Sequence, residues 1–281
     1  GSDAVYTLNF TTSVTDANDT LNVYFDQVRS RGSDHAQLSV DGFKTFDITT
    51  QGGDNTLQSV DGAALETLNI SGNENLIIKG QLSDDVATIN ADGFGGQLGA
   101  SSDFLQLGDV IQNTDTVDVK GGDAGNYVDL SSINSSDELD ASDDTLTIQG
   151  GTGDDYFNLG TVLADGNINS NVTVSINGGA DSQNTLEVSG DNAVANTDAD
   201  VTNFDISNIQ KVVNTSIGNE NDLNVTEVGG LGELEIKEDS NGGNNTLTFA
   251  DGVDVRISGE TSTGTVILTV ENAASDNLIA K

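Results

Sequence analysis

The chain has 281 residues, and its 46 Asp and Glu outnumber 9 Lys and Arg, which leaves a formal net charge of −37. So few basic residues exclude a nucleic-acid-binding surface and a basic membrane-docking patch, because both require Lys and Arg gathered on one face. The absence of Cys excludes disulfides, zinc–thiolate sites and thiol nucleophiles. Bound cations, high salt or an elongated shape would relieve the self-repulsion of so much negative charge.

The length allows one elongated domain or two compact ones. We expect a single elongated region over residues 1–281, with a loop or break near 190–205, where alternation is weak. The missing Met and the apolar run Asn277–Ile279 indicate a fragment of a larger secreted protein. No apolar run reaches membrane-spanning length, so we expect no membrane insertion.

Short segments in which apolar and polar residues alternate recur along the chain. They are Glu66–Ile70, Asp144–Ile148, Asn171–Ile176, Asn184–Val188, Glu233–Ile236 and Val253–Ile257. This period of two predicts half-buried strands closed by Gly, Asn and Asp turns. Only Ala63–Glu66 and Ala193–Ala199 could form a helical turn, so the fold class is all-β.

Three segments share the order strand, Gly-Gly, acidic loop, strand. Their glycine pairs begin at Gly121, Gly150 and Gly178, and so follow one another at nearly even intervals. A repeat that cannot bury its own apolar face is the signature of a solenoid. We therefore predict an elongated parallel β-solenoid, β-helix-like or β-roll-like, with degenerate repeats and roughly 10–14 turns. A pair of β-sandwiches would explain the alternation equally well, but not the Gly-Gly punctuation.

The stretch Gly150–Asn158 fits the calcium-binding nonapeptide G-G-x-G-x-D-x-U-x, where U is a large apolar residue, at every fixed position. Glycine permits positive φ and a tight turn, which would direct backbone carbonyls onto an ion. Asp155 would add a carboxylate, and Phe157 would point inward to anchor the next strand. The alternative is a plain glycine-rich turn that holds no metal.

Adjacent turns of a solenoid would share an ion, so neighbouring loops should complete the coordination of six to eight oxygens that calcium prefers. The candidate metal ligands are Gly122, Asp123, Asn126, Asp129, Asp143, Asp144, Gly151, Gly153, Asp154, Asp155, Gly179, Asp181 and Asn184. We expect Ca²⁺ clustered around residues 121–184. The looser copies elsewhere are better explained as Asn and Asp turns or stacked polar ladders.

No set of residues points to catalysis, and no organic cofactor site is predicted. His35 is the only His, and its sequence neighbours Ser33 and Asp34 do not make a triad, because triads are assembled by the fold. No pair among the 46 acids is singled out for glycoside hydrolysis. We therefore expect no enzyme, and keep a polysaccharide-active enzyme on a β-helix as a distant alternative.

The nonapeptide Gly150–Asn158 resembles the repeat of the repeats-in-toxin (RTX) family. The irregular copies, such as Leu65–Gly80, resemble the degenerate repeats of RTX-type bacterial surface-layer (S-layer) proteins. This resemblance implies type I secretion, calcium-triggered folding at the extracellular cell surface, and a structural role in a self-assembling lattice. The partner would be the chain itself, with cell-surface polysaccharide as a second candidate partner. The alternative function is a calcium-stiffened extension module of an RTX adhesin.

Overall fold

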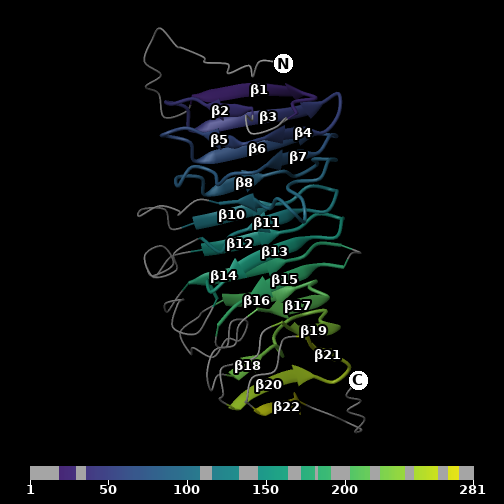
Figure 1. The fold of residues 1–281 in the computed structure, drawn as a ribbon. Coiled ribbons are helices and arrows are strands. Elements are labelled where there is room, and N and C mark those ends of the chain that lie inside the picture. The colour runs from purple at the N-terminus through teal and green to yellow at the C-terminus, as the bar shows by residue number, and fades with distance from the viewer. Residues whose placement is uncertain are drawn as a thin grey trace.

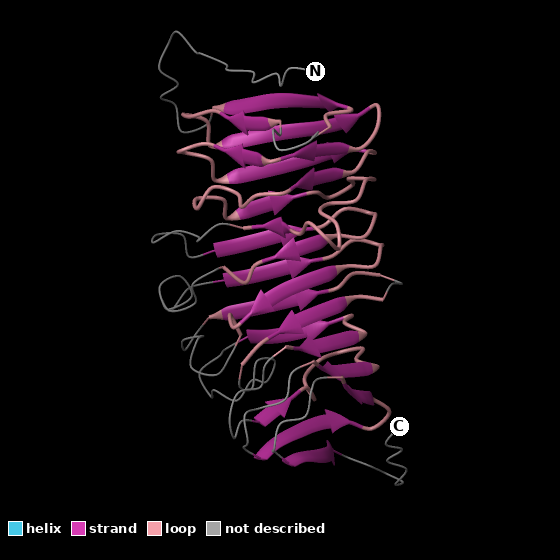
Figure 2. Cartoon of the chain, in the orientation of Figure 1, coloured by secondary structure: helices cyan, strands magenta, loops and turns pink. Residues whose placement is uncertain are grey.

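The computed structural model describes residues 19–29, 36–107, 116–132, 145–163, 172–180, 183–190, 203–215, 222–237, 244–258 and 265–271. Within them every regular element is a strand and none is a helix (Figure 2). The strands are β1 (Thr20–Asp26), β2 (Gln37–Ser39), β3 (Thr45–Gln51), β4 (Asn55–Leu57), β5 (Ser59–Asp61), β6 (Thr67–Gly72), β7 (Leu76–Ile78), β8 (Thr88–Asn90), β9 (Leu105–Gln106), β10 (Thr116–Lys120), β11 (Tyr127–Asp129), β12 (Thr145–Gln149), β13 (Tyr156–Gly160), β14 (Thr173–Asn177), β15 (Thr185–Val188), β16 (Asn203–Ser207), β17 (Lys211–Asn214), β18 (Asp222–Asn224), β19 (Glu233–Ile236), β20 (Asn244–Ala250), β21 (Asp254–Ile257) and β22 (Thr265–Glu271).

Two long sheets organise the molecule, and their strands stack from the N-terminal to the C-terminal end (Figure 1). Sheet 1 has eight strands in the order β1-β3-β6-β8-β10-β12-β14-β16. Sheet 2 has seven, β21-β19-β17-β15-β13-β11-β9, and sheet 3 has three, β18-β20-β22. Two short sheets, β2-β5 and β4-β7, complete the early turns. From β8 to β17 the chain alternates between sheets 1 and 2, so the fold is the predicted parallel β-solenoid.

Every strand pair in these sheets is parallel, which excludes the alternative of antiparallel β-sandwiches. The predicted repeat also holds. Val119 pairs with Ile148, and Ile148 with Ile176, so the three Gly-Gly segments are consecutive turns. Residues 203–205, at the end of the suspected break, belong to β16, which pairs with β14.

The turns differ in length along the axis. In sheet 1, Thr45 pairs with Thr67 and Thr67 with Thr88. The next step, in which Thr88 pairs with Asp118, takes a clearly longer stretch of chain. In the turns that follow, long connections lead from sheet 2 back to sheet 1, as between β11 and β12. The chain makes about seven turns in this stack. The expected 10–14 turns were therefore too many, because that number spread the repeat over all 281 residues, whereas the strands of sheet 1 span only residues 20–207.

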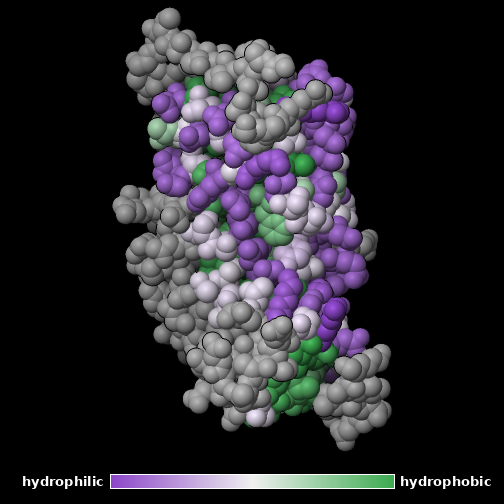
Figure 3. Space-filling view, viewed as in Figure 1, coloured by the Kyte–Doolittle hydropathy of each residue, from purple (hydrophilic) through white to green (hydrophobic). Residues whose placement is uncertain are grey.

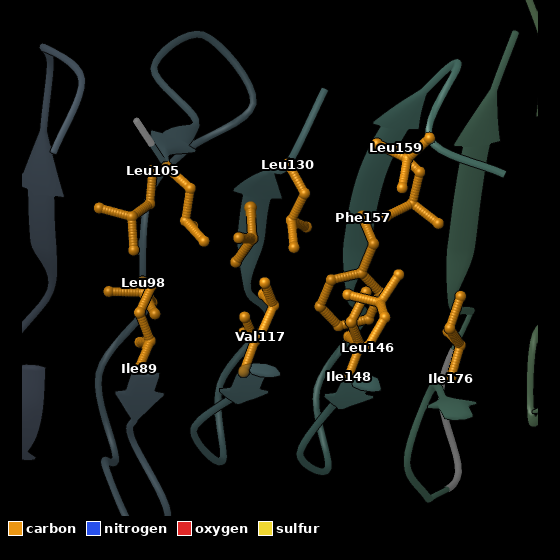
Figure 4. Packing of buried hydrophobic residues seen from close by; sticks show 14 of the residues in the cluster. Ile89, Leu98, Leu105, Val117, Leu130, Leu146, Ile148, Phe157, Leu159 and Ile176 are labelled. Atoms are coloured by element: carbon orange, nitrogen blue, oxygen red, sulfur yellow. The ribbon is translucent and has the colours of Figure 1, made fainter. Parts of the chain in front are cut away.

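The core is a single layer of aliphatic and aromatic side chains between the sheets (Figure 4). Inward residues such as Ile89, Leu146 and Phe157 are fully buried, while their strand neighbours face outward. Each such side chain contributes roughly 1.5–3 kcal/mol of burial free energy. The alternation read from the sequence thus marks the two faces of β6, β12 and β14 correctly.

The possible helical turns and a membrane-spanning helix were the remaining expectations about secondary structure. Residues 63–66 form a turn and no helix, while residues 193–199 lie outside the described residues. No helix in the described part of the chain is long and apolar enough to cross a membrane.

Candidate functional site

The nonapeptide lies at the corner where each turn passes from sheet 1 to sheet 2. Three Gly-Gly loops stack there in register. The Gly121 amide donates to the Gln149 carbonyl at 2.7 Å, and the Gly150 amide to the Asn177 carbonyl at 2.8 Å. The Gly178 amide continues the series to the carbonyl of Ser207 at 2.9 Å. The sequence repeat therefore becomes a row of equivalent loops along the solenoid axis.

The glycines of the nonapeptide are required by close stacking. Among the described residues Gly179 has a positive φ of 92°, whereas Gly150 and Gly151 do not have positive φ. A Cβ on Gly151 would lie 1.7 Å from the Gly122 carbonyl oxygen of the preceding turn. The expectation that Gly150 and Gly151 serve to reach positive φ was therefore wrong. They are glycine because the backbone of the neighbouring turn occupies the space of a side chain.

One row of residues follows these loops, buried in every member but the half-buried Gln210, and we name it the corner column. It consists of Asn55, Leu76, Leu98, Asn126, Asp155, Asn184 and Gln210, one from each successive turn. From Asn126 onward each backbone amide donates to the side-chain oxygen of the next member. The distances are 2.9 Å from Asn126 to Asp155, 3.1 Å from Asp155 to Asn184 and 2.9 Å from Asn184 to Gln210.

Asp155 is the charged member of this column, and it is 1% exposed. Its Oδ1 also accepts the side-chain amide of Asn126 at 2.6 Å, and its Oδ2 accepts the backbone amide of Gly151 at 3.1 Å. Burial raises the pKa of Asp155 to about 6, although the hydrogen bonds from Asn126 and Gly151 oppose the rise. The nearby Asp154 charge adds to it.

The other predicted ligands lie apart from the corner column. Asp154 is exposed, and its carboxylate accepts the Gln183 amide at 2.8 Å. Asp123 is exposed as well. Asp129 is half-buried on β11 and accepts the Asn158 side-chain amide at 3.2 Å. The structure thus brings together Asn126, Asp155 and Asn184 with the glycines of their loops. Asp143, Asp144 and Asp181 lie outside the described residues.

The described residues fit a calcium ion only in part. Their carboxylate, amide and carbonyl oxygens are the hard donors that calcium takes. However, both oxygens of Asp155 already accept N–H groups, and no three His, Cys, Asp or Glu of the described residues gather closely enough to hold a metal ion. In this arrangement the hydrogen bonds of the corner column satisfy the Asp155 carboxylate without a metal ion. Calcium in these loops would need Asp155 together with loop carbonyls.

An open trough of about 930 Å³ runs along the outer side of the same corner, and we name it the corner trough. Its lining is mostly amide side chains and glycine backbone. The residues are Asp92, Lys120, Gly121, Asp123, Gln149, Gly150, Gly151, Thr152, Asn177, Gly179, Ala180, Gln183, Asn208 and Gln210. Gln149 and Asn177 were not among the predicted site residues, although each stands directly before a Gly-Gly pair and the repeat already placed them in equivalent positions. Asn208 and Gln210 join the same surface only through the stacking of turns.

Acidic and aromatic side chains cover part of the outer face of sheet 2. Glu187 accepts the Tyr156 hydroxyl and lies 3.3 Å from the Lys237 ammonium. Glu235 lies 2.6 Å from the Lys211 ammonium, whose hydrogen bond lowers the pKa of that carboxyl. Burial raises the pKa of Tyr156, and its bond to Glu187 raises it further. These carboxylates are therefore held in ion pairs, an arrangement that stabilises charge on the sheet. His35 lies outside the described residues.

The surface in the view of Figure 3 is mostly hydrophilic, with apolar side chains gathered near the C-terminal end. Ile257 and Ile267 in the last strands are 43% and 45% exposed.

Comparison with known proteins does not assign this chain to a family. A scan of family models, a search of curated proteins and a search of solved structures each return no match.

Proposed function

We propose that this chain is a structural segment of a calcium-dependent, self-assembling bacterial surface layer. The observation that carries the proposal is the uninterrupted stack of parallel strands in sheets 1 and 2, which share one core. Such a stack resists bending because each strand of these sheets is hydrogen-bonded to strands of the neighbouring turns. A stiff, non-globular unit of this kind suits a coat that must keep its shape outside the cell.

Calcium is part of the proposal because the charge of −37 must be balanced when copies pack side by side. Divalent cations held by acidic loops would neutralise this charge and join neighbouring copies. The Gly-Gly loops, with Asp155 and the loop carbonyls, supply oxygens for the part of this binding that lies within one chain.

Negative-stain electron microscopy of the purified chain, with calcium and with chelator, tests the assembly. Ordered sheets that form with calcium and dissolve in chelator are the expected result. Isolated particles at every protein and calcium concentration would overturn the coat. The same rod-like stack also favours a second candidate, a calcium-stiffened extension module of an adhesin, and isolated straight rods are the outcome that it predicts.

A calcium titration of the melting temperature tests the metal separately. Binding to the folded state alone stabilises by about 2.7 kcal/mol at a calcium concentration of 100 Kd. Asp155→Ala should reduce the calcium-dependent part of the melting shift, whereas Asp251→Asn, in an exposed turn away from the loops, should keep it. Equal melting temperatures in calcium and in chelator would show that the acidic loops are ordinary turns.

A further inference from the structure

We propose that the corner trough binds an extended, uncharged polysaccharide chain that lies along the solenoid axis. The inference rests on the proposed function only for the source of the polymer, the envelope of the cell that the coat would cover. Binding itself requires neither assembly nor calcium.

The floor of the trough is bare backbone. At Gly150 a Cβ would lie 2.3 Å from the Gly178 carbonyl oxygen, and at Gly179 it would lie 2.0 Å from the carbonyl oxygen of Gly151. Side chains are therefore excluded from the floor by the stacking of the turns. The floor of the trough is therefore formed by glycine backbone of neighbouring turns, where a polymer would meet no side chain.

The walls carry neutral groups that both donate and accept hydrogen bonds. Gln149 and Gln183 are exposed. Asn177 is fixed between two partners, because its Oδ1 accepts the Gly179 amide at 2.9 Å and the Asn208 side-chain amide at 2.8 Å. A side-chain amide offers two N–H donors and a carbonyl acceptor. This combination matches sugar hydroxyls, each of which also donates and accepts.

The amides are spaced with the period of the solenoid. Lys120 pairs with Gln149, and Gln149 with Asn177, so these residues occupy one column of sheet 1. Neighbouring strands lie about 4.8 Å apart. That spacing is close to the length of one sugar residue in an extended polysaccharide. Successive turns would therefore offer a polar group to successive sugars.

The charge around the trough argues for an uncharged polymer. Its one basic residue is Lys120, whose ammonium lies 3.8 Å from the Asp118 carboxylate. Asp92 and Asp123 also line the trough. With a net charge of −37 on the chain, an acidic polysaccharide would be repelled.

Affinity electrophoresis in native gels tests this inference on the dilute, unassembled chain in chelator. The probes are dextran, a mannan, a galactan and a xylan as neutral polymers, with polygalacturonate as the acidic one. We expect at least one neutral polymer to retard the chain and polygalacturonate to have no effect. Retardation by none of the neutral polymers, or by polygalacturonate alone, would overturn the inference.

The variant Gln149→Ala/Gln183→Ala locates the binding. Both side chains are exposed, so the fold should persist, which circular dichroism checks. We expect at least a tenfold loss of affinity, whereas the matched control Gln37→Ala/Gln106→Ala, at exposed sites outside the trough, should bind as the parent does. Gln149→Trp, which narrows the trough, should also abolish retardation. Unchanged binding by both trough variants would place the polymer elsewhere. Sheet formation, measured separately, distinguishes this failure from a failure of the proposed coat.

Discussion

Along the corner column the buried residues change from apolar, at Leu76 and Leu98, to polar in the central turns, while the first member, Asn55, is polar as well. Leu76 and Leu98 occupy the corner column in the early turns, and Asn126, Asp155 and Asn184 occupy it in the central ones. All five are at most 1% exposed. A buried leucine, Leu98, and a buried carboxylate, Asp155, thus hold equivalent positions two turns apart.

The difference follows from where the inward N–H groups of each corner find acceptors. In the loop that precedes Leu98, the amide of Phe94, four residues before the column member, donates to the backbone carbonyl of Ala91 at 2.9 Å. In the central turns the second glycine of the pair donates to a corner-column side chain instead. The Gly122 amide bonds Asn126 Oδ1 at 3.0 Å, and the Gly151 amide bonds Asp155 Oδ2 at 3.1 Å. The need of backbone N–H groups for a hydrogen-bond acceptor, and not hydrophobicity alone, therefore determines which residue stands at a buried corner.

Disrupting the close stacking of the central turns should lower the free energy of unfolding more than any other change. Gly151→Val places atoms where the Gly122 carbonyl already lies, so we expect a loss of more than about 4 kcal/mol in unfolding free energy, measured by urea denaturation. Gly93→Ala is the control, because nothing lies within 4 Å of its added Cβ. Its φ of +75° should still cost about 1–2 kcal/mol. Equal losses in the two variants would refute the stacking argument.

Replacing a polar member of the corner column by an apolar residue should have the second-largest effect on the free energy of unfolding. Asp155→Leu leaves the amides of Asn126 and Gly151 without acceptors, and each buried unsatisfied group costs about 1–3 kcal/mol. We expect a loss of about 3–5 kcal/mol by the same denaturation measurement in chelator. The apolar exchange Leu98→Ile should cost less than about 1.5 kcal/mol. A stable Asp155→Leu variant would mean that the column does not need its polar members.

The pH dependence of stability sharpens the comparison further. The pKa of Asp155 is raised from 3.8 to about 6 in the folded chain, so the folded state binds this proton more tightly than the unfolded state. The buried carboxylate therefore costs nothing below about pH 4 and costs up to about 3 kcal/mol above pH 6. In chelator, the stability of the parent relative to Asp155→Asn should fall by up to this amount between pH 4 and 7. Parallel pH profiles would contradict it.

Removing an ion pair outside the corner column should have the smallest effect on the free energy of unfolding. Lys44 and Glu66 form a pair in an early turn, with side chains 39% and 44% exposed. Solvent screens such pairs, so Lys44→Gln should change the unfolding free energy by no more than about 1 kcal/mol. A larger loss would indicate that outer-face charges, and not the corner column, set the stability of the early turns.

The sequence by itself determined the strands and the repeat, because both are local signals. Alternation in Glu233–Ile236 predicts β19 at its observed bounds, and the glycine pairs predict that their three loops lie in consecutive turns. Asp155 was also identified from the sequence, as part of a nonapeptide. Its place in a buried column, and the amides that hold it, could not be predicted in this way.

Only the tertiary structure decided which residues lie one turn away from each other. In sheet 1 the step from Thr67 to its partner Thr88 is much shorter than the next step, from Thr88 to Asp118. No fixed period therefore aligns Leu76 with Leu98 and also Leu98 with Asn126. Hydrogen bonding between turns fixes that register, and it explains why Gly151 must be glycine and why the amides of the corner trough share one surface.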